Sequence, residues 1–301
     1  MKNVVSVSLG SSKRNHAVEV EILGTPIRIE RIGTDGDFNK AISLLRQLDG
    51  RVDAIGLGGI DLYLHCEDRR FVIRDAKKLA RAVKKTPVVD GSGLKLTLEY
   101  LAIKKIVEMG YSLSGKKVLM VSAIDRWGMA KALNEVGAEV VYGDLIFGLG
   151  IPVPIRNYET FKKLAFTIAP IVVQMPFKIL YPTGKEQEKE PDPKYARYYE
   201  EADVVAGDFL FIRKYMPGEI KGKWIITNTT TSDDVEELKK RGVSYLFTTT
   251  PVYEGRSFGT NVMEAAFIAI LGRRPEEVTP DDYFDLLARM NYAPHVIELN
   301  P

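Results

Sequence analysis

Residues Gly115–Asp144 read GKKVLMVSAIDRWGMAKALNEVGAEVVYGD, and this stretch decides the fold class. Residues 118–122 form a short apolar run, 127–136 carry apolar residues at helical spacing, and 139–142 form a second apolar run. A strand, a helix and a strand in this order predict one unit of a parallel sheet. We therefore expect an α/β protein.

The same alternation continues on both sides of this stretch. At roughly 150 residues per domain, 301 residues predict about two domains. The polar segment Ser112–Gly115 is the best boundary, so we expect an N-terminal α/β substrate domain over 1–110 and a Rossmann-like parallel-sheet domain over 111–301. Further helices are expected at 38–48, 76–85, 94–109, 158–169, 233–241, 261–271 and 280–290, and an exposed loop at 180–195.

Composition excludes several classes of protein. Lys and Arg number 42 and Asp and Glu 40, so a net charge of +2 predicts no nucleic-acid or membrane-surface partner. The single cysteine excludes an internal disulfide and favours the cytoplasm, and three scattered histidines predict no metal site. The apolar stretch 164–177 is shorter than the ~18 residues of a membrane span. Abundant Lys, Arg and Glu are typical of a thermophilic source, and a homodimer is left open.

Polar side chains follow most of the predicted strands, and ligands of parallel sheets bind at the carboxyl ends of strands. Asp144 lies nineteen residues after Asp125, which suits the acid that binds the ribose of a dinucleotide. The turn Ser122–Gly128 lacks the usual glycines, although Arg126 could pair with a phosphate. The predicted cofactor residues are Ser122, Asp125, Arg126, Asp144, Asn228, Thr229 and Thr249. The alternative is that such residues only cap helices and turns.

Two basic loops are further candidates for anion binding. The segment Lys13-Arg14-Asn15-His16 directly follows the first strand, and Arg256 lies between two glycines in Gly255–Gly259. Arg256 could bind a carboxylate or phosphate. The alternative for both loops is solvated surface charge.

Three motifs resemble the shikimate/quinate 5-dehydrogenase family, in particular a divergent branch labelled quinate 5-dehydrogenase. Asp90-Gly91-Ser92-Gly93 is similar to the family's aspartate–glycine motif. Ile225–Thr230, with Asn228-Thr229 at its end, is similar to the segment beside the nicotinamide. Met263–Pro275 resembles the family's closing helix.

The resemblance implies an oxidoreductase that transfers hydride between NAD or NADP and a small hydroxylated carboxylate. It implies that Ser6 and Ser8 hold the substrate carboxylate, with Ser11 and Ser12 as alternatives, and we place Arg256 and Asn261 at the same site. Asp90 matches the aspartate of a catalytic Lys/Asp pair. No lysine follows the third strand, so Lys13, Lys95 or Lys185 would have to replace it.

The missing lysine and glycines favour a second interpretation. The chain is then a non-redox enzyme, or a metabolite-binding or regulatory protein with a degenerate dinucleotide site. Asp90 has two interpretations as well, because an aspartate before a helix also serves as an N-cap. As a cap alone, it should tolerate replacement by Asn.

Overall fold

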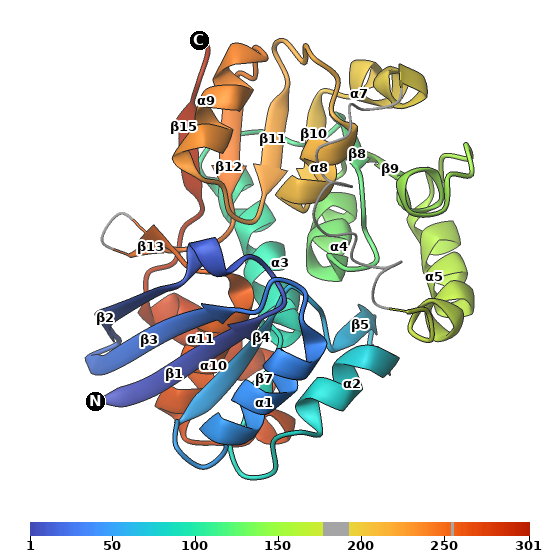
Figure 1. The fold of residues 1–301 in the computed structure, drawn as a ribbon. Helices are drawn as coiled ribbons and strands as arrows, with labels where there is room; N and C mark the ends of the chain where they lie inside the picture. Colours follow the sequence, from blue (N-terminus) through green and yellow to red (C-terminus); the bar gives the residue numbers. More distant parts are fainter. Residues whose placement is uncertain (177–192, 254–255) are drawn as a thin grey trace. The chain divides into compact units, whose positions relative to one another are not determined.

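The computed structural model describes residues 1–176, 193–253 and 256–301, with the side chains of 252–257 left out (Figure 1). The chain forms two compact units. The described part of unit 1 consists of 1–97, 168–176 and 258–292, and that of unit 2 of 98–167, 193–257 without the two undescribed positions, and 293–301. This mixed α/β architecture with parallel sheets confirms the predicted class.

Unit 1 is built on a five-stranded sheet in the order β2-β3-β1-β4-β7. β1 runs parallel to β3 and β4, β4 runs parallel to β7, and only β2 is antiparallel, pairing with β3. The carboxyl ends of the four parallel strands therefore lie at one edge. The bounds are β1 (Lys2–Ser8), β2 (His16–Ile22), β3 (Thr25–Gly33), β4 (Ala54–Gly58) and β7 (Val88–Val89). Between β4 and β7 along the chain, β5 (Tyr63–Cys66) and β6 (Arg69–Val72) form a separate two-stranded hairpin.

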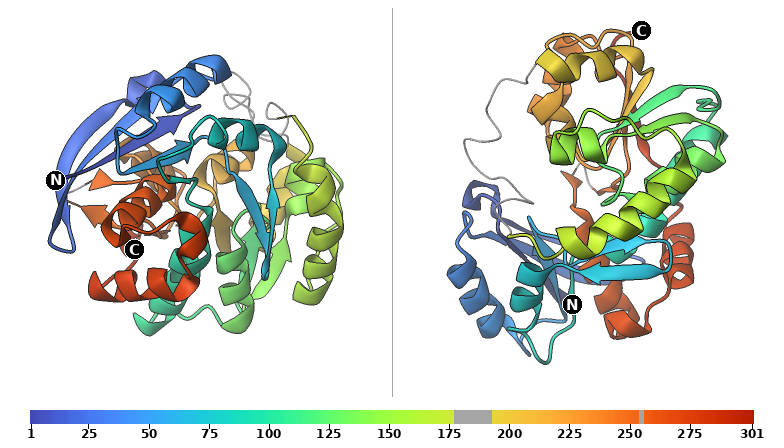
Figure 2. Two further views of the ribbon diagram at one scale, coloured as in Figure 1. Left: turned by 90° about the horizontal axis from the view of Figure 1, so that it is seen from below. Right: turned by 90° about the vertical axis from the view of Figure 1, so that its right-hand side faces the viewer.

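Helices cover both faces of this sheet. Val4 to Ser8 of β1 are therefore all buried, without the alternation of a strand that has one face in solvent. Figure 2 shows α1 and the pair α10 and α11 on opposite faces. Asp37 caps α1, and its side chain accepts from the amide of Lys40. The helical bounds are η1 (Ser12–Arg14), α1 (Phe38–Leu48), α2 (Arg74–Ala80), α10 (Thr260–Leu271), η5 (Pro275–Glu277) and α11 (Pro280–Arg289). α3 (Ser92–Glu108) begins in unit 1 and ends in unit 2.

Glycines let α10 approach the sheet closely. A Cβ on Gly56 would lie 2.6 Å from the carbonyl oxygen of Asn261, and one on Gly91 would lie 2.5 Å from the Asn261 amide nitrogen. Gly91 also has φ +92°, which disfavours other residues. These contacts fix the start of α10 against the carboxyl edge of the sheet.

Unit 2 contains a six-stranded sheet in the order β15-β12-β11-β10-β8-β9, parallel except for β15. Buried apolar residues such as Phe147, Tyr199 and Leu246 form its core. The strands are β8 (Lys117–Met120), β9 (Glu139–Tyr142), β10 (Val204–Gly207), β11 (Trp224–Thr227), β12 (Tyr245–Thr248) and β15 (His295–Glu298), and a separate hairpin joins β13 (Val252–Tyr253) and β14 (Arg256–Ser257).

The helices of unit 2 follow the strands as predicted for βαβ units. Thr231 caps α9 through a reciprocal capping box with Asp234, as its sequence indicates. The bounds are α4 (Trp127–Glu135), the π-helical η2 (Asp144–Gly148), α5 (Tyr158–Val172), η4 (Pro193–Tyr195), α7 (Ala196–Glu201), α8 (Phe209–Tyr215) and α9 (Ser232–Lys240). None of the helices within the described ranges is long and apolar enough to span a membrane.

The division of the chain differs from the predicted boundary between 110 and 111. The first unit ends at Thr97, within α3, and regains 258–292, so α10 and α11 do not belong to the second unit. The physical reason is the apolar surface of α10, where residues 262–269 are all buried and pack on β1 and β4. The Rossmann-like character of unit 2 stays a prediction. Most of the predicted loop 180–195 lies outside the described residues.

Candidate functional site

Two guanidinium groups converge beside Gly10, immediately after the carboxyl end of β1. A methyl group placed on Gly10 would lie 2.9 Å from Nη2 of Arg14 and 3.1 Å from Nη2 of Arg31. The same point lies 3.2 Å from Oγ of Ser8. Like charges this close repel each other, and an anion between them would remove that repulsion. We call Ser8, Gly10, Arg14 and Arg31 the Gly10 cradle.

Arg31 is the better fixed of the two cations. Its Nη1 donates to the carbonyl oxygen of Ser11 at 3.0 Å, and its Nη2 donates to Oγ of Ser8 at 3.0 Å. Burial and the nearby Arg14 lower the pKa of Arg31, and Asp35 raises it. The Asp35 carboxylate also accepts from the Ser12 amide at 2.7 Å. One carboxylate thus faces two guanidinium groups, so the cradle has an excess of positive charge.

Ser8 contributes a buried hydroxyl, with only 4% of the residue exposed. Its Oγ accepts from the amide of Gly10 at 3.0 Å as well as from Arg31. A hydroxyl oxygen has two acceptor positions, so the remaining interaction of Ser8 is donation of its own hydrogen. Among the described residues no acceptor for that hydrogen is found. The cradle thus offers a hydroxyl donor between two cations.

The predicted substrate residues Ser6, Ser8 and Asn261 lie close together in unit 1. Nδ2 of Asn261 donates to Oγ of Ser6 at 2.8 Å. A Cβ on Gly58 would lie 3.0 Å from Oγ of Ser8 and 3.2 Å from Nδ2 of Asn261. The Gly10 cradle and the first turn of α10 therefore share one edge of the sheet. The role of these residues in substrate binding stays a prediction.

Asp90 is engaged by the protein itself. Its Oδ2 accepts from the amides of Leu62 at 2.5 Å and Tyr63 at 3.2 Å. Its Oδ1 accepts from the amide and hydroxyl of Ser92, at 3.2 and 2.7 Å. Burial and Asp61 raise the pKa of Asp90, while the hydrogen bonds and Lys95 oppose that rise. The Asp90 carboxylate thus links the segment 61–63 to the start of α3. A helix N-cap would bond only to the first turn of its own helix, so Asp90 has a wider structural role.

Two of the three predicted catalytic lysines, Lys13 and Lys95, lie in the described part of the structure. Nζ of Lys95 binds Oδ1 of Asp61 at 2.9 Å, with the two side chains 10% and 15% exposed. Lys13 lies in η1 with an exposed side chain. His65 lies nearby, with Nε2 3.2 Å from Oγ of Ser92, and burial lowers its pKa to about 4, so it is neutral at pH 7. Lys185 lies outside the described residues.

Glu264 is a buried acid that the sequence does not single out. It accepts from the amide of Gly91 at 2.6 Å and from the hydroxyl of Tyr283 at 2.7 Å. Burial, followed by the charge of Asp90, raises its pKa to about 8, against the effect of the hydrogen bonds from Tyr283, Gly91 and Leu94. Glu264 therefore binds a proton in the folded protein at neutral pH.

This burial makes stability depend on pH. The native pKa of Glu264 is raised above its ordinary value of 4.5, so the folded state binds more protons than the unfolded state between pH 4.5 and about 8. The free energy of unfolding should fall as pH rises through this window, by up to ~1.4 kcal/mol per pH unit. We expect Glu264→Gln to flatten this dependence in urea unfolding measured from pH 5 to 9, and exposed Glu276→Gln to leave it unchanged. Equal slopes for the wild type and Glu264→Gln would contradict the assignment.

In unit 2, Asp144 fills the turn where a dinucleotide phosphate was expected. Its Oδ1 accepts from the amides of Ala123 and Ile124, both at 3.0 Å. Burial raises its pKa to about 6, with the two amides opposing. A carboxylate of the chain already occupies the amides that a pyrophosphate would use. The residues present thus do not fit a dinucleotide at this turn, and binding of NAD or NADP stays an untested prediction.

Arg126 is likewise neutralised within the protein. Its guanidinium pairs with Glu99 and, at 2.9 Å, with Oδ2 of Asp208, and only 3% of its side chain is exposed. Asp125 lies 3.8 Å from its Nε. Nδ2 of Asn228 donates to the same Asp208 oxygen at 3.0 Å. Arg126 and Asn228 therefore belong to a buried charge network.

The remaining predicted cofactor residues make local contacts. Ser122 donates to Oδ1 of Asp125 at 2.7 Å, and the Thr229 and Thr250 hydroxyls lie 3.0 Å apart. Thr249 is fully buried after β12. The side chain of Arg256 lies outside the described part of the structure. Within the described ranges, no group of His, Cys, Asp and Glu side chains could hold a metal ion.

Sequence reasoning missed Arg31 and Glu264. Arg31 lies in the charged strand Arg28-Ile29-Glu30-Arg31, which indicates only a solvated face. Glu264 is the one charged residue in the apolar segment 262–271. A single acid among apolar residues indicates a carboxyl group that is buried with its helix, and this pattern could have identified Glu264.

The chain is a two-unit α/β protein, and the carboxyl edge of the parallel sheet in unit 1 carries the arginines and the serine of the Gly10 cradle. Residues 93–299 match the family described as domain of unknown function DUF8754, and the chain belongs to that family. Residues 3–90 match a second one, domain of unknown function DUF8753. The gap between the two matches falls at the start of α3. No curated protein matches the sequence.

Solved structures give only distant similarity. The glucose-galactose binding protein GanP from Geobacillus stearothermophilus is 11% identical with a TM-score of 0.40, over 99% of this chain and 97% of that one. A galactofuranose binding protein is 14% identical with a TM-score of 0.36, over 97% and 99%. A XylFII-LytSN complex mutant is 10% identical with a TM-score of 0.41, over 99% and 97%. Such scores carry no argument about what this chain binds.

The predicted membership of the shikimate/quinate 5-dehydrogenase family is wrong, and so is the NAD(P)-dependent oxidoreductase function that followed from it. The families whose models match the chain are the two domains of unknown function. The geometry gives the physical reason. The Asp90 carboxylate accepts hydrogen bonds from the backbone of unit 1, and Lys95 forms an ion pair with Asp61, so both groups are engaged within the unit. Location in the cytoplasm stays a prediction.

Proposed function

We propose that this protein binds a small anionic metabolite at the carboxyl edge of the sheet in unit 1, without a redox step. The observation that carries the proposal is the convergence of the Arg14 and Arg31 Nη2 atoms on one point beside Gly10. Ser8 adds a buried hydroxyl donor at the same point. Carboxylate and phosphate groups are the ligands that two guanidinium groups and a hydroxyl bind best.

The ligand in this proposal is small and polar. The Gly10 cradle binds its charged group, and the Asn261 side chain at the start of α10 binds a hydroxyl or carbonyl of the same molecule. Asn261 is suited to this because its Nδ2 donates to Ser6 while its amide oxygen retains acceptor capacity. The excess of cations over Asp35 at the cradle favours a ligand that carries at least one full negative charge.

Isothermal titration with phosphate, citrate and gluconate tests this function. We expect saturable binding of at least one of them, weakened about tenfold to a hundredfold by Arg31→Gln, because a hydrogen bond to a charged group contributes about 1.5–3 kcal/mol. Gly10→Ala should have a similar effect by filling the cradle. It keeps an ordinary backbone conformation, since Gly10 is not among the glycines with positive φ.

Arg28→Gln is the matched control, because Arg28 lies on the same strand with a side chain 48% exposed. It should leave affinity unchanged. Binding that survives both Arg31→Gln and Gly10→Ala would show that the ligand site lies elsewhere.

A further inference from the structure

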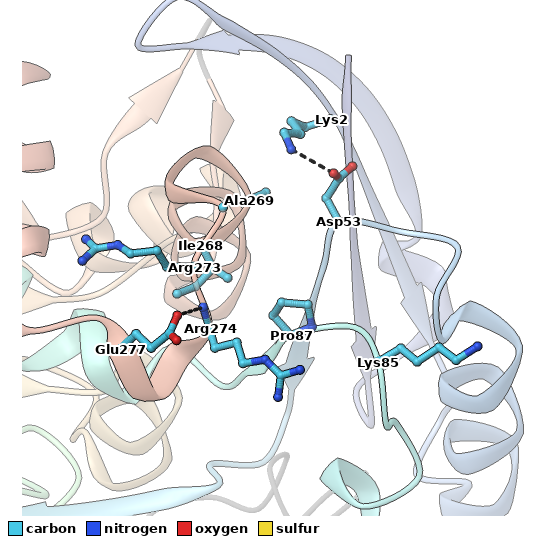
Figure 3. A pocket seen from close by; sticks show the side chains of 10 residues that line it. Lys2, Asp53, Lys85, Pro87, Ile268, Ala269, Arg273, Arg274 and Glu277 are labelled. Atoms are coloured by element: carbon cyan, nitrogen blue, oxygen red, sulfur yellow. Dashed lines mark hydrogen bonds and ion pairs between the residues drawn. The ribbon is translucent and has the colours of Figure 1, made fainter.

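A pocket of about 400 Å³ lies at the opposite edge of the unit 1 sheet from the Gly10 cradle (Figure 3). Lys2 begins β1, and Asp53 and Pro87 directly precede β4 and β7, so the pocket is at the amino ends of parallel strands. The end of α10 and the segment after it form the other wall. The charged residues of its lining are Lys2, Lys85, Arg273, Arg274, Asp53 and Glu277.

The charges of this pocket do not balance. Lys2 binds Asp53 at 3.1 Å, and Arg273 binds Asp282 on α11, outside the pocket. The Glu277 carboxylate accepts from the backbone amide of Arg274 at 3.0 Å. Among the described residues, neither the Arg274 guanidinium nor the Lys85 ammonium has a carboxylate within ion-pair distance. Arg274 is thus without a carboxylate partner among the described residues, while Lys85 lies near Asp49, whose pKa its charge helps to lower.

The position of Arg274 is fixed by its backbone rather than by its side chain. The turn of η5 holds the Arg274 amide against Glu277, and Figure 3 shows the side chain of Arg274 extending from this turn below Pro87. Arg273 points away from Pro87 in the same view. Pro87, Ile268 and Ala269 add an apolar part to the lining.

The geometry points to a second binding site in this pocket, for a small multivalent anion such as a phosphate ester. Cations after the last turn of a helix also interact favourably with the helix dipole, which accounts for Arg273 and Arg274. It does not account for Lys2 and Lys85, which come from two other segments of the chain. The volume lies within the range of small-molecule sites, roughly 300–1,000 Å³.

Inorganic pyrophosphate is the probe for this site. It should be titrated calorimetrically into the variant Arg14→Gln/Arg31→Gln, in which the Gly10 cradle is disabled. We expect one binding equivalent, weakened about tenfold or more by Arg274→Gln and less by Lys85→Gln. Arg46→Gln, an exposed arginine on α1, should have no effect. In a protein with an intact Gly10 cradle, Arg274→Gln should likewise weaken pyrophosphate binding at the pocket and leave anion binding at the cradle unchanged.

The outcomes separate this site from the proposed function. Pyrophosphate binding that is unaffected by Arg274→Gln and Lys85→Gln in both backgrounds would overturn the second site, as would absence of binding. An Arg14→Gln/Arg31→Gln variant that binds small anions as well as the wild type would instead overturn the Gly10 cradle. Because both arginines of the cradle lie at the other edge of the sheet, the two results are independent.

Discussion

Arg126→Met should destabilise the protein by about 3–5 kcal/mol, the usual cost of removing one partner from a buried ion pair. Arg126 is 3% exposed and its partner Glu99 is fully buried, so the substitution leaves a carboxylate in the core without its cation. Asp208 loses the same partner but is 26% exposed and can be hydrated. Chemical denaturation monitored by circular dichroism measures the change.

The second variant in this experiment is Arg126→Met/Glu99→Gln. Removing both charges should recover a large part of the lost stability, because the cost arises from a buried carboxylate that has lost the charge of Arg126. Arg289→Met is the control, since its pair with Asp285 is exposed and such pairs contribute ~0–1 kcal/mol. A cost below ~1 kcal/mol for Arg126→Met would contradict the buried network.

Asp90→Asn should destabilise the protein by about 2–4 kcal/mol. Both carboxylate oxygens of Asp90 accept hydrogen bonds, so an Asn amide group must face donors on one side. This reverses the expectation that Asn would substitute for Asp as a cap. Three backbone amides and a hydroxyl donate to the two oxygens of Asp90, and Asn has only one oxygen, so at least one buried donor is left unpaired.

Asp37→Asn provides the matched comparison. Asp37 caps α1 with one side-chain hydrogen bond, to the exposed amide of Lys40, and Asn caps as well as Asp. It should change the free energy of unfolding by less than ~0.5 kcal/mol. If both substitutions cost the same, Asp90 is an ordinary cap after all.

Much of the fold is predictable from the sequence because its signals are local. The apolar spacing of residues 38–48 predicts α1 within its observed bounds, and 118–142 predicts the strand, helix and strand of unit 2. The domain boundary is not local. The helix 260–271 packs on the first sheet because Gly56 and Gly91 leave room for its first turn. Both glycines are far from this helix in the sequence, so local patterns do not show which sheet it covers.

The site was predictable only in part for the same reason. Ser6, Ser8 and Asn261 were expected in one site and lie close together, because strand ends of a parallel sheet share an edge. The role of Arg31 can be seen only in the structure, because the pairing of β3 with β1 places its side chain beside Ser8. Asp144 and Arg126 were expected to bind a cofactor from their sequence positions, but sequence could not show that Ala123 and Glu99 occupy them.

The most direct test of the account is a crystal of the protein soaked in selenate, whose selenium can be located by anomalous scattering. We expect a peak beside Gly10, with selenate oxygens within hydrogen-bond distance of Nη2 of Arg14, Nη2 of Arg31 and Oγ of Ser8. The same soak of Gly10→Ala should show no peak there. A wild-type crystal at saturating selenate with no density at this position would contradict the anion-binding function.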